Sequence, residues 1–498
     1  MVALAWFALA LSMGLYDDAD VTMLTVMVFL PAAFAFSFRA VGMYRTEDLV
    51  NPHASVQAAA VAALCFIPVV AAQPQLLLPL MLTFLGFLLF VRSHKPALLL
   101  IPLPAAFVCA PTLVNAVRFA SDGTWRQLFG SVMLPSSAHD GKPVVANLSD
   151  LLLRVFGIGA DGGAWRYVAV SILALIVLLA AVSLVLPFVL RVSRMMWVAV
   201  FAGLATALLS AAIAVAVDVD GPVSGSMLPG TTYAMMGLLA CICMMSGGAV
   251  RRFVMLRQHE KTGAVEIEGR GSIASHVGRA VLVCLLAVSV VACAGFNYVE
   301  CDHSQVKTSD AGLPMVATDF LGQDDARRVL ALRADSAESV SYSVMRTGRG
   351  DLIDSSPAQR VEVVSGRSDG SSRTIAQDCA QLLANADSDA INELGKLGFG
   401  GIYVIKQNGD KAQREASNQL NSNIGASDGT QNVVSLDNGT YYRLTVQDLS
   451  KQHIDRSGLD KAGSSVWRRS WLWCMGVVLV AYCLVALPRI RRQGLEEA

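Results

Sequence analysis

Charged residues are scarce in this sequence, and neither sign is in excess. Only 16% of the 498 residues are Asp, Glu, Lys or Arg, and 39 basic side chains balance 39 acidic ones. A nucleic-acid-binding protein needs a basic surface, so this balance excludes nucleic acid as a partner. Apolar residues take the place of charge: 54% of the chain is hydrophobic and its mean hydropathy is +0.51. This composition predicts a multi-pass membrane protein.

Ionisable side chains are also missing from the middle of every long apolar run. Proton relays and ion paths through membranes depend on such residues, so their absence argues against an ion-coupled transporter. The first apolar run, residues 2–15, has neither a charged start nor an A-x-A site, and no cleavable signal is predicted.

Cysteine is confined almost entirely to apolar surroundings, where a thiol behaves as a small hydrophobe. Of the ten cysteines, only Cys301 and Cys379 fall in a polar region. A disulfide between these two and a pair of free thiols are both compatible with the sequence.

The apolar runs are close to the roughly 20 residues that a helix needs to cross a bilayer, and they predict about ten spans. The predicted spans are residues 2–15, 21–38, 55–72, 75–91, 96–117, 167–190, 195–217, 233–250, 280–298 and 470–490. The first is short, and whether it crosses stays open. Several spans contain proline, which frees a backbone carbonyl that a neighbouring helix or a water-lined cavity must satisfy. Kinks inside a packed bundle are therefore expected.

Basic residues fix the predicted orientation of the spans. The loop 251–279 is rich in arginine, whereas the loop 218–232 contains no Lys or Arg. Because cytoplasmic loops carry the excess of Lys and Arg, 251–279 is placed inside, and both termini follow it. The segments 16–20, 118–166 and 218–232 are then outside. The prediction is a multi-pass protein of the cell membrane with both termini cytoplasmic.

The one long hydrophilic region lies between the last two predicted spans. It divides the chain into a membrane bundle (1–298), an extracytoplasmic α+β domain (299–467), and a final span with a basic tail (468–498). Strands are predicted from apolar or alternating runs at 328–333, 340–345, 361–364, 401–405, 433–436 and 441–446. Helices are predicted at 374–386 and 388–397, and a surface helix in the outer loop at 148–157.

Two acidic pairs at the outer ends of spans are the candidate site residues. Asp18 and Asp20, with Asp17 beside them, follow the first span, and Asp218 and Asp220 follow the seventh. Either pair offers carboxylate oxygens to a divalent cation, although no cofactor is identified. Alternatively, Asp18 or Asp20 is the general base of a glycosyltransferase that uses lipid-phosphate sugars. The sequence favours a third interpretation, in which these acids are solvated span ends.

Two other motifs give weaker evidence for a functional site. Gly157-x-Gly159-x-x-Gly162 has the spacing of a dinucleotide-binding loop but lacks the strand and helix around it. His139 and His303 have no second ligand at a spacing typical of zinc sites.

Several stretches after residue 96 carry a resemblance to a known family. They are 100–104 (LIPLP) with 132–134 (VML), 220–223 (DGPV) with 228–230 (LPG), 394–405 (LGKLGFGGIYVI) and 437–444 (DNGTYYRL). Their order and turn residues resemble the membrane-embedded C-terminal region of large actinobacterial proteins of glycosyltransferase family 2. Tyr442 stands where that family leads us to expect Trp.

The resemblance implies a place in the assembly of cell-envelope polysaccharide or glycolipid. The family's sugar-nucleotide domain needs a cytoplasmic α/β region with Asp-x-Asp after a strand, and this sequence opens directly in an apolar run. Asp18-x-Asp20 has the spacing but is predicted to lie outside. We therefore expect a non-catalytic membrane component whose partners are membrane lipids, a lipid-linked glycan and a separate catalytic protein. The alternatives are the lipid-phosphate-sugar glycosyltransferase and a module that binds envelope glycan or protein.

Overall fold

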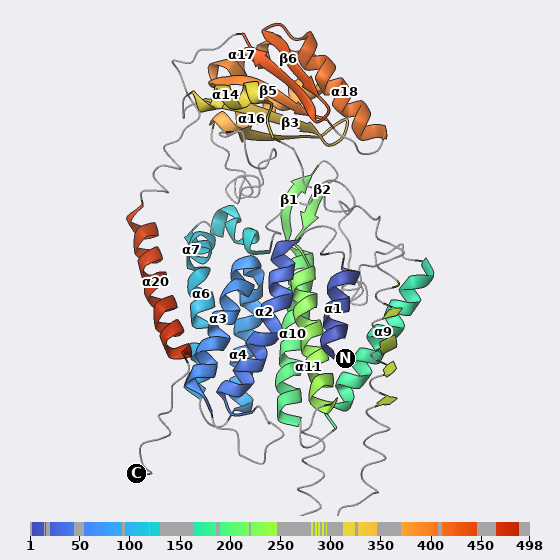
Figure 1. The fold of residues 1–498 in the computed structure, drawn as a ribbon, viewed down its shortest axis with the longest axis vertical. Helices are drawn as coiled ribbons and strands as arrows, with labels where there is room; N and C mark the ends of the chain where they lie inside the picture. Colours follow the sequence, from blue (N-terminus) through green and yellow to red (C-terminus); the bar gives the residue numbers. More distant parts are fainter. Residues whose placement is uncertain are drawn as a thin grey trace, which may run out of the picture.

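The structure, a computed structural model, has a bundle of helices with a group of strands and helices above one end (Figure 1). It describes residues 2–13, 15, 20–43, 54–91, 95–118, 120–129, 163–185, 190–218, 221–246, 312–323, 327–345, 370–406, 411–445 and 465–487, and scattered residues from Ala280 to Gly295. The predicted helix 148–157, the predicted strand 361–364 and the glycine motif at 157–162 lie outside the described residues.

The bundle is built from helices that follow most of the predicted spans. Their bounds are α1 (Val2–Ser12), α2 (Val21–Ala40), α3 (Val56–Ala72), η1 (Pro74–Leu76), α4 (Leu77–Phe90), α5 (Lys95–Leu100), α6 (Leu103–Val108), α7 (Ala110–Arg118), η2 (Ala120–Asp122), η3 (Thr124–Phe129), α9 (Gly163–Val182), α10 (Leu190–Ala212), α11 (Leu228–Ser246) and α20 (Val466–Ala486). A short hairpin of β1 (Ala214–Asp218) and β2 (Gly221–Ser224) joins α10 to α11.

Three of the described helices, α2, α10 and α20, are long and apolar enough to cross a membrane. A fourth crossing results if α5, α6 and α7 form one broken span. The other apolar helices, such as α1 and α3, are shorter. The chain therefore has the apolar helices of a membrane protein. The predicted number of spans, about ten, is larger than the number of described helices that are long enough to cross a membrane.

Two predicted spans differ from single straight helices. The predicted span 96–117 is a broken helix, because the chain bends by 69° between residues Lys95–Val108 and Ala110–Arg118. Prolines in this stretch remove the amide donors that a continuous helix needs. The predicted span 195–217 is helical only to Ala212, after which alternating valines favour strand β1 of the β1–β2 hairpin.

Close helix packing and aromatic contacts build the core of the bundle. The Phe34 ring contacts the rings of Phe66, Phe87 and Tyr233 edge-on, with centroids 5.5, 6.3 and 5.7 Å away. Small residues bring α10 against α11: a Cβ added to Gly203 would lie 2.7 Å from the carbonyl oxygen of Gly230. Glycine is required at this crossing because any side chain would separate the two backbones.

Carbonyls freed by proline accept hydrogen bonds from side chains of other helices. Pro31 lies inside α2 and cannot donate to the carbonyl of Met27, four residues earlier. The indole Nε1 of Trp6, on α1, donates to this oxygen at 2.8 Å. In the last turn of α3, where carbonyls have no helical amide, the Val70 carbonyl accepts from the Cys109 thiol at 3.7 Å. The expectation that proline kinks are satisfied within a packed bundle is confirmed at Pro31.

The broken helix α5–α7 follows the same rule, and its donors come from α20. Pro104 frees the carbonyl of Leu100, and the Tyr482 hydroxyl donates to it at 2.8 Å. Pro111 frees the carbonyl of Phe107, and Trp471 Nε1 donates to it at 3.0 Å. Three helical turns separate Trp471 from Tyr482, so both side chains lie on one face of α20.

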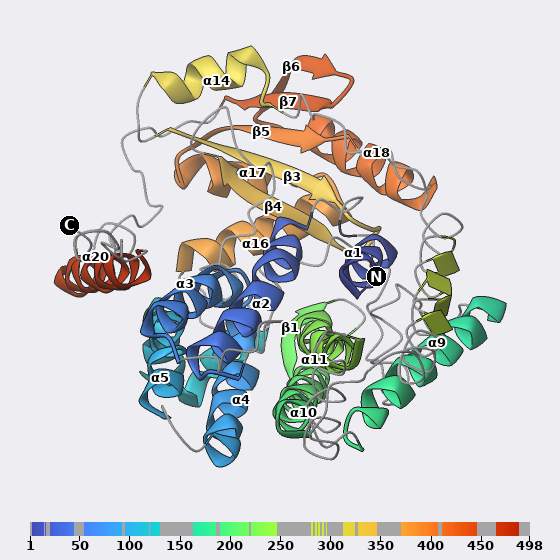
Figure 2. The same cartoon turned by 60° about the horizontal axis from the view of Figure 1, so that its bottom comes forward.

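α20 is the least buried of the long helices. Only 6% of its most apolar stretch is buried, and it stands at the edge of the bundle in both views (Figures 1 and 2). Its contacts are with α3 and α6. At its C-terminal end the Gln57 side chain donates to the carbonyl of Ala486 at 2.9 Å. Polar contacts therefore fix this helix where apolar burial is small.

Described elements next to the segments predicted to face outward lie at one end of the bundle. α7 and the β1–β2 hairpin lie at the end nearest the α+β domain (Figure 1), and η3, which contacts both α7 and β1, also contacts η1. The ends of α2 and α20 and the starts of α3 and α10 lie at the opposite end. We refer to the first as the domain-side end.

The α+β domain is a five-stranded mixed sheet covered by helices. Its elements are α14 (Met315–Gly322), β3 (Arg328–Ala334), β4 (Val340–Met345), α16 (Gly370–Ala384), α17 (Ser388–Lys396), β5 (Phe399–Ile405), α18 (Lys411–Ala426), β6 (Thr430–Leu436) and β7 (Gly439–Leu444). The strand order is β4-β3-β5-β7-β6, with β3 and β5 parallel and the other pairs antiparallel.

Alternating side chains of the central strands fill two cores. Leu330, Leu332, Ile402 and Val404 pack against α16, α17 and α18. Val329, Ala331 and Tyr403 face the other way, toward the core that includes α14. Burial on both faces explains why β5 reads as a continuous apolar run.

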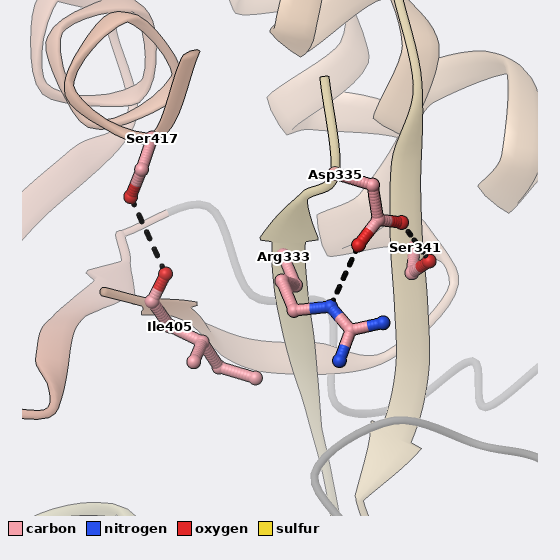
Figure 3. Close-up of polar contacts among 5 residues, drawn as sticks. All are labelled: Arg333, Asp335, Ser341, Ile405 and Ser417. Atoms are coloured by element: carbon pink, nitrogen blue, oxygen red, sulfur yellow. Dashed lines mark hydrogen bonds and ion pairs between the residues drawn. The ribbon is translucent and has the colours of Figure 1, made fainter. Parts of the chain in front are cut away.

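The sheet confirms the strands predicted at 328–333, 340–345, 401–405, 433–436 and 441–446. The helices predicted at 374–386 and 388–397 are present as α16 and α17, and Gly398 follows α17 with φ of 94°. In the β3–β4 turn, Arg333 Nε donates to Asp335 Oδ1 at 2.7 Å and Ser341 donates to the other carboxylate oxygen (Figure 3). Nearby, the Ser417 hydroxyl of α18 donates to the Ile405 carbonyl at 3.4 Å and joins that helix to β5 (Figure 3).

The pairing of Trp6 with the carbonyl freed by Pro31 predicts a coupled pair of mutations. Trp6→Phe removes the donor and should lower the free energy of unfolding by about 1 kcal/mol. Pro31→Ala restores an amide donor to the Met27 carbonyl. In the Pro31→Ala protein, Trp6→Phe should therefore lower the free energy of unfolding by much less. Unfolding of the four proteins in detergent–lipid mixtures measures the coupling. Equal costs of Trp6→Phe in both backgrounds would contradict this account.

Candidate functional site

The predicted acidic residues do not come together as a site in the described structure. Asp17, Asp18 and Asp220 lie outside the described residues, and Asp218 is described only as backbone at the end of β1. No group of three metal-ligating side chains occurs among the residues that the structure describes. His139 and His303 fall outside that set. A divalent-cation site at Asp218 and Asp220 therefore stays a prediction.

Asp20 caps the N-terminus of α2. Its Oδ1 accepts hydrogen bonds from the backbone amides of Thr22 and Met23, at 3.1 and 3.0 Å, and from the Thr22 hydroxyl at 2.6 Å. An N-cap carboxylate satisfies amides that have no partner in the first turn and lies at the positive end of the helix dipole. A structural role thus accounts for this carboxylate.

The Asp20 cap leads into a buried polar group around η1. Gln73 Nε2 donates to the Thr22 hydroxyl oxygen at 2.9 Å, so Gln73, Thr22 and Asp20 form one chain of hydrogen bonds. On the far side of Pro74, Gln75 Oε1 accepts from the Ser210 hydroxyl of α10 at 2.8 Å. Both glutamines are 2% exposed. We call Gln73, Gln75, Thr22 and Ser210 the glutamine site.

Each glutamine has one amide atom without a partner. Gln73 Oε1 and Gln75 Nε2 are buried and make no hydrogen bond with the residues that the structure describes. Leaving a buried polar atom unpaired costs about 1–3 kcal/mol, so such atoms indicate a missing partner. Gln73 Oε1 is an acceptor and Gln75 Nε2 is a donor.

The segment that covers the glutamine site comes from the broken helix. We call α7, η2 and η3 the outer cap. η3 contacts η1, and the Ser226 amide donates to the Phe129 carbonyl at 3.1 Å. A Cβ on Gly225 would lie 2.8 Å from that same carbonyl oxygen, so only glycine permits this approach.

An aromatic side chain of the outer cap is open to solvent. The Trp125 ring is 37% exposed and packs edge-on against Phe129, with centroids 6.4 Å apart. The Arg126 guanidinium lies 5.9 Å from the Trp125 ring centroid. An amphipathic ring at this end of the bundle offers a flat apolar surface beside polar groups.

The chemistry of this arrangement fits a neutral, hydroxyl-bearing ligand. A hydroxyl both donates and accepts, and so matches an unpaired carbonyl oxygen and an unpaired amide group. An anion would give Gln73 Oε1 no donor, and a cation would give Gln75 Nε2 no acceptor. A buried water has the same two capacities. Each unpaired atom can therefore be satisfied by a hydroxyl group or by water.

Sequence analysis did not identify the glutamine site. The available signal was Gln73-Pro74-Gln75, two amides on either side of a proline between long apolar runs. A polar pair in such surroundings is costly unless it has partners, which makes it a functional hypothesis in a membrane protein. The sequence instead favoured Asp18, Asp20, Asp218 and Asp220 as candidate site residues, because they are charged.

A second unusual group lies in the α+β domain. Asp378 of α16 is 2% exposed, and its Oδ2 has no partner among the described residues. Burial first, and then the neighbouring carboxylates of Glu393 and Asp387, raise the pKa of Asp378 to about 7. The adjacent Cys379 is a free thiol, and burial raises its pKa. A disulfide of Cys379 with Cys301, which lies outside the described residues, is not present.

No protein-family model and no curated protein matches the chain. Among solved structures, the chain is similar to an arabinofuranosyltransferase, AftD, from Mycobacteria, with 13% sequence identity and a TM-score of 0.44. The matched region covers 88% of this chain and 31% of that enzyme. The chain thus spans about a third of the length of that protein, and the likeness is distant.

The capping role of Asp20 predicts different results for two substitutions. Asp20→Ala removes the cap and the contact with Thr22 and should lower stability by about 1–2 kcal/mol. Asp20→Asn keeps an oxygen acceptor and should remain close to wild type in both stability and function. Thermal unfolding measures the stability of each variant, and complementation of a deletion strain measures its function. Loss of function in a stable Asp20→Asn protein would instead indicate a catalytic carboxylate.

The raised pKa of Asp378 predicts a pH-dependent stability. The folded protein binds this proton more tightly than the unfolded chain, in which the pKa is near 3.8. The contribution is therefore full at low pH and is lost as pH rises toward about 7. Asp378→Asn should stabilise the domain by roughly 2 kcal/mol at pH 8 and change little at pH 4. Hydrogen exchange of residues 370–396 at both pH values, corrected for intrinsic rates, tests this. An equal effect of Asp378→Asn at both pH values would refute it.

Proposed function

We propose that this chain is a membrane component of a system that assembles cell-envelope polysaccharide or glycolipid. In this role it binds a lipid-linked glycan at the domain-side end of the bundle while a separate protein catalyses sugar transfer. The observation that carries the proposal is the glutamine site, whose unpaired amide atoms match hydroxyl groups. η1, between the two glutamines, contacts η3 of the outer cap, which also carries the exposed Trp125. The resemblance of residues 394–405 and 437–444 to the glycosyltransferase family supports the same setting.

The proposal includes a topology of about ten spans with both termini in the cytoplasm. Supporting it, the segments with few basic residues gather at the domain-side end, and Arg39 and Arg191 lie near the opposite end of their helices. A glycan at the domain-side end would then meet the α+β domain on the outer face of the membrane.

The second function considered from the sequence is catalysis by Asp18 or Asp20. The three hydrogen bonds to Asp20 Oδ1 favour a structural role for that residue. The non-catalytic role is therefore proposed in preference to it.

Removal of the two amides tests the function. Gln73→Leu with Gln75→Leu should reduce the mature envelope glycan and weaken retention of the lipid-linked precursor about tenfold, since about 1.4 kcal/mol corresponds to one order of magnitude. The readouts are the sugar composition of the envelope and the amount of precursor that co-purifies. Gln57→Leu is the matched control, because Gln57 bonds to Ala486 at the opposite end of the bundle.

Two results would overturn the proposal. One is an unchanged envelope composition after deletion of the whole chain. The other is a double variant that folds and yet matches Gln57→Leu in both readouts.

A further inference from the structure

The outer cap is held at its bend by one side chain of α20. The chain turns by 69° between α6 and α7, and Pro111 just beyond the turn has no amide to donate to the Phe107 carbonyl, four residues earlier. Trp471 Nε1 donates to that oxygen at 3.0 Å, beside the backbone N–H of Cys109. Cys109, at the turn itself, donates to the Val70 carbonyl of α3. These two contacts connect the bend to the rest of the bundle.

A continuous series of contacts leads from this bend to the glutamine site. α6 contacts α7, α7 packs against η3, and η3 contacts η1, which lies between Gln73 and Leu77. The direction of α7 after the bend therefore determines where η3 lies over η1. A change in the bend would move the cover of the glutamine site.

Tyr482 makes a similar contact but in a different place. It donates to the Leu100 carbonyl, at the junction of α5 and α6, and that junction is two turns of chain before the bend. Both contacts link α20 to the same broken helix through a carbonyl freed by proline. Only the Trp471 contact lies at the bend that leads into the outer cap.

We propose that Trp471 is a positioning residue for the glutamine site, and that its hydrogen bond to Phe107 sets the outer cap in its closed position. α20 has little buried surface to hold it, so this bond is a large part of its attachment near the cap. The proposal about the cap is independent of what the site binds. Its consequence for glycan binding rests on the proposed function.

Hydrogen exchange in the full-length protein in lipid nanodiscs tests the inference. Trp471→Phe keeps an aromatic ring and removes the donor, and it should raise exchange about fivefold at residues 120–129 and 73–78, as expected for loss of one hydrogen bond. Trp471→Gln keeps a side-chain N–H and should restore protection. Tyr482→Phe is the matched control, with increased exchange near Leu100 and wild-type exchange at the cap.

The outcomes separate this inference from the proposed function. Equal exchange at 120–129 in Trp471→Phe and Tyr482→Phe, or a failure of Trp471→Gln to restore protection, would overturn it. If Trp471→Phe is not recovered as folded protein, Trp471→Leu takes its place. If exchange at residues 120–129 rises in Trp471→Phe and the envelope glycan is unchanged, the result counts against the proposed function. The positioning role of Trp471 is then still supported.

Discussion

The carbonyl oxygens freed by proline are the constraint on which the bundle depends. In surroundings without water, an unpaired backbone carbonyl costs several kcal/mol, and a proline in a helix removes the amide that would satisfy it. Here Trp6, Trp471 and Tyr482 supply donors from other helices to the carbonyls of Met27, Phe107 and Leu100. Each of the prolines that free these carbonyls thereby specifies which helix lies beside it. This explains how α20, with little buried area, has a defined place.

The glutamine site is the point where this rule is left incomplete. Elsewhere in the bundle a buried hydroxyl has a partner, as Tyr233 does with Thr83 at 3.0 Å. At η1, by contrast, two buried amides each keep one atom unpaired among the described residues, and η1 contacts the outer cap, which follows a bent helix. A buried water or a hydroxyl group of a ligand would complete both amides. The proposed function assigns this place to a ligand hydroxyl.

Sequence patterns predicted what depends on local periodicity and missed what depends on contacts between distant segments. The strands around β3 and β5 were predictable because apolar residues and turns mark them, and Gly398 marks the end of α17. α18 was missed because its only buried apolar residues are Ala416, Leu420 and Ile424, a spacing hidden by the low hydropathy of the segment. Prolines predicted kinks, but the donors, such as Trp471 for Phe107, are hundreds of residues away. Acidic residues were taken as site candidates, whereas the buried partners of Gln73 and Gln75 appear only when α2, η1 and α10 meet.

The most direct measurement of the central claim is the distance between a tryptophan indole and the carbonyl freed by proline. The chain has seven tryptophans, so labelling with 15N at the indole of Trp and 13C at the carbonyl of Met suits solid-state NMR in lipid bilayers. The account predicts dipolar dephasing between Trp6 and Met27 at about 4 Å, as a hydrogen bond to the carbonyl oxygen requires, and its loss in Trp6→Phe. A spectrum in which Trp6→Phe removes no dephasing would contradict it.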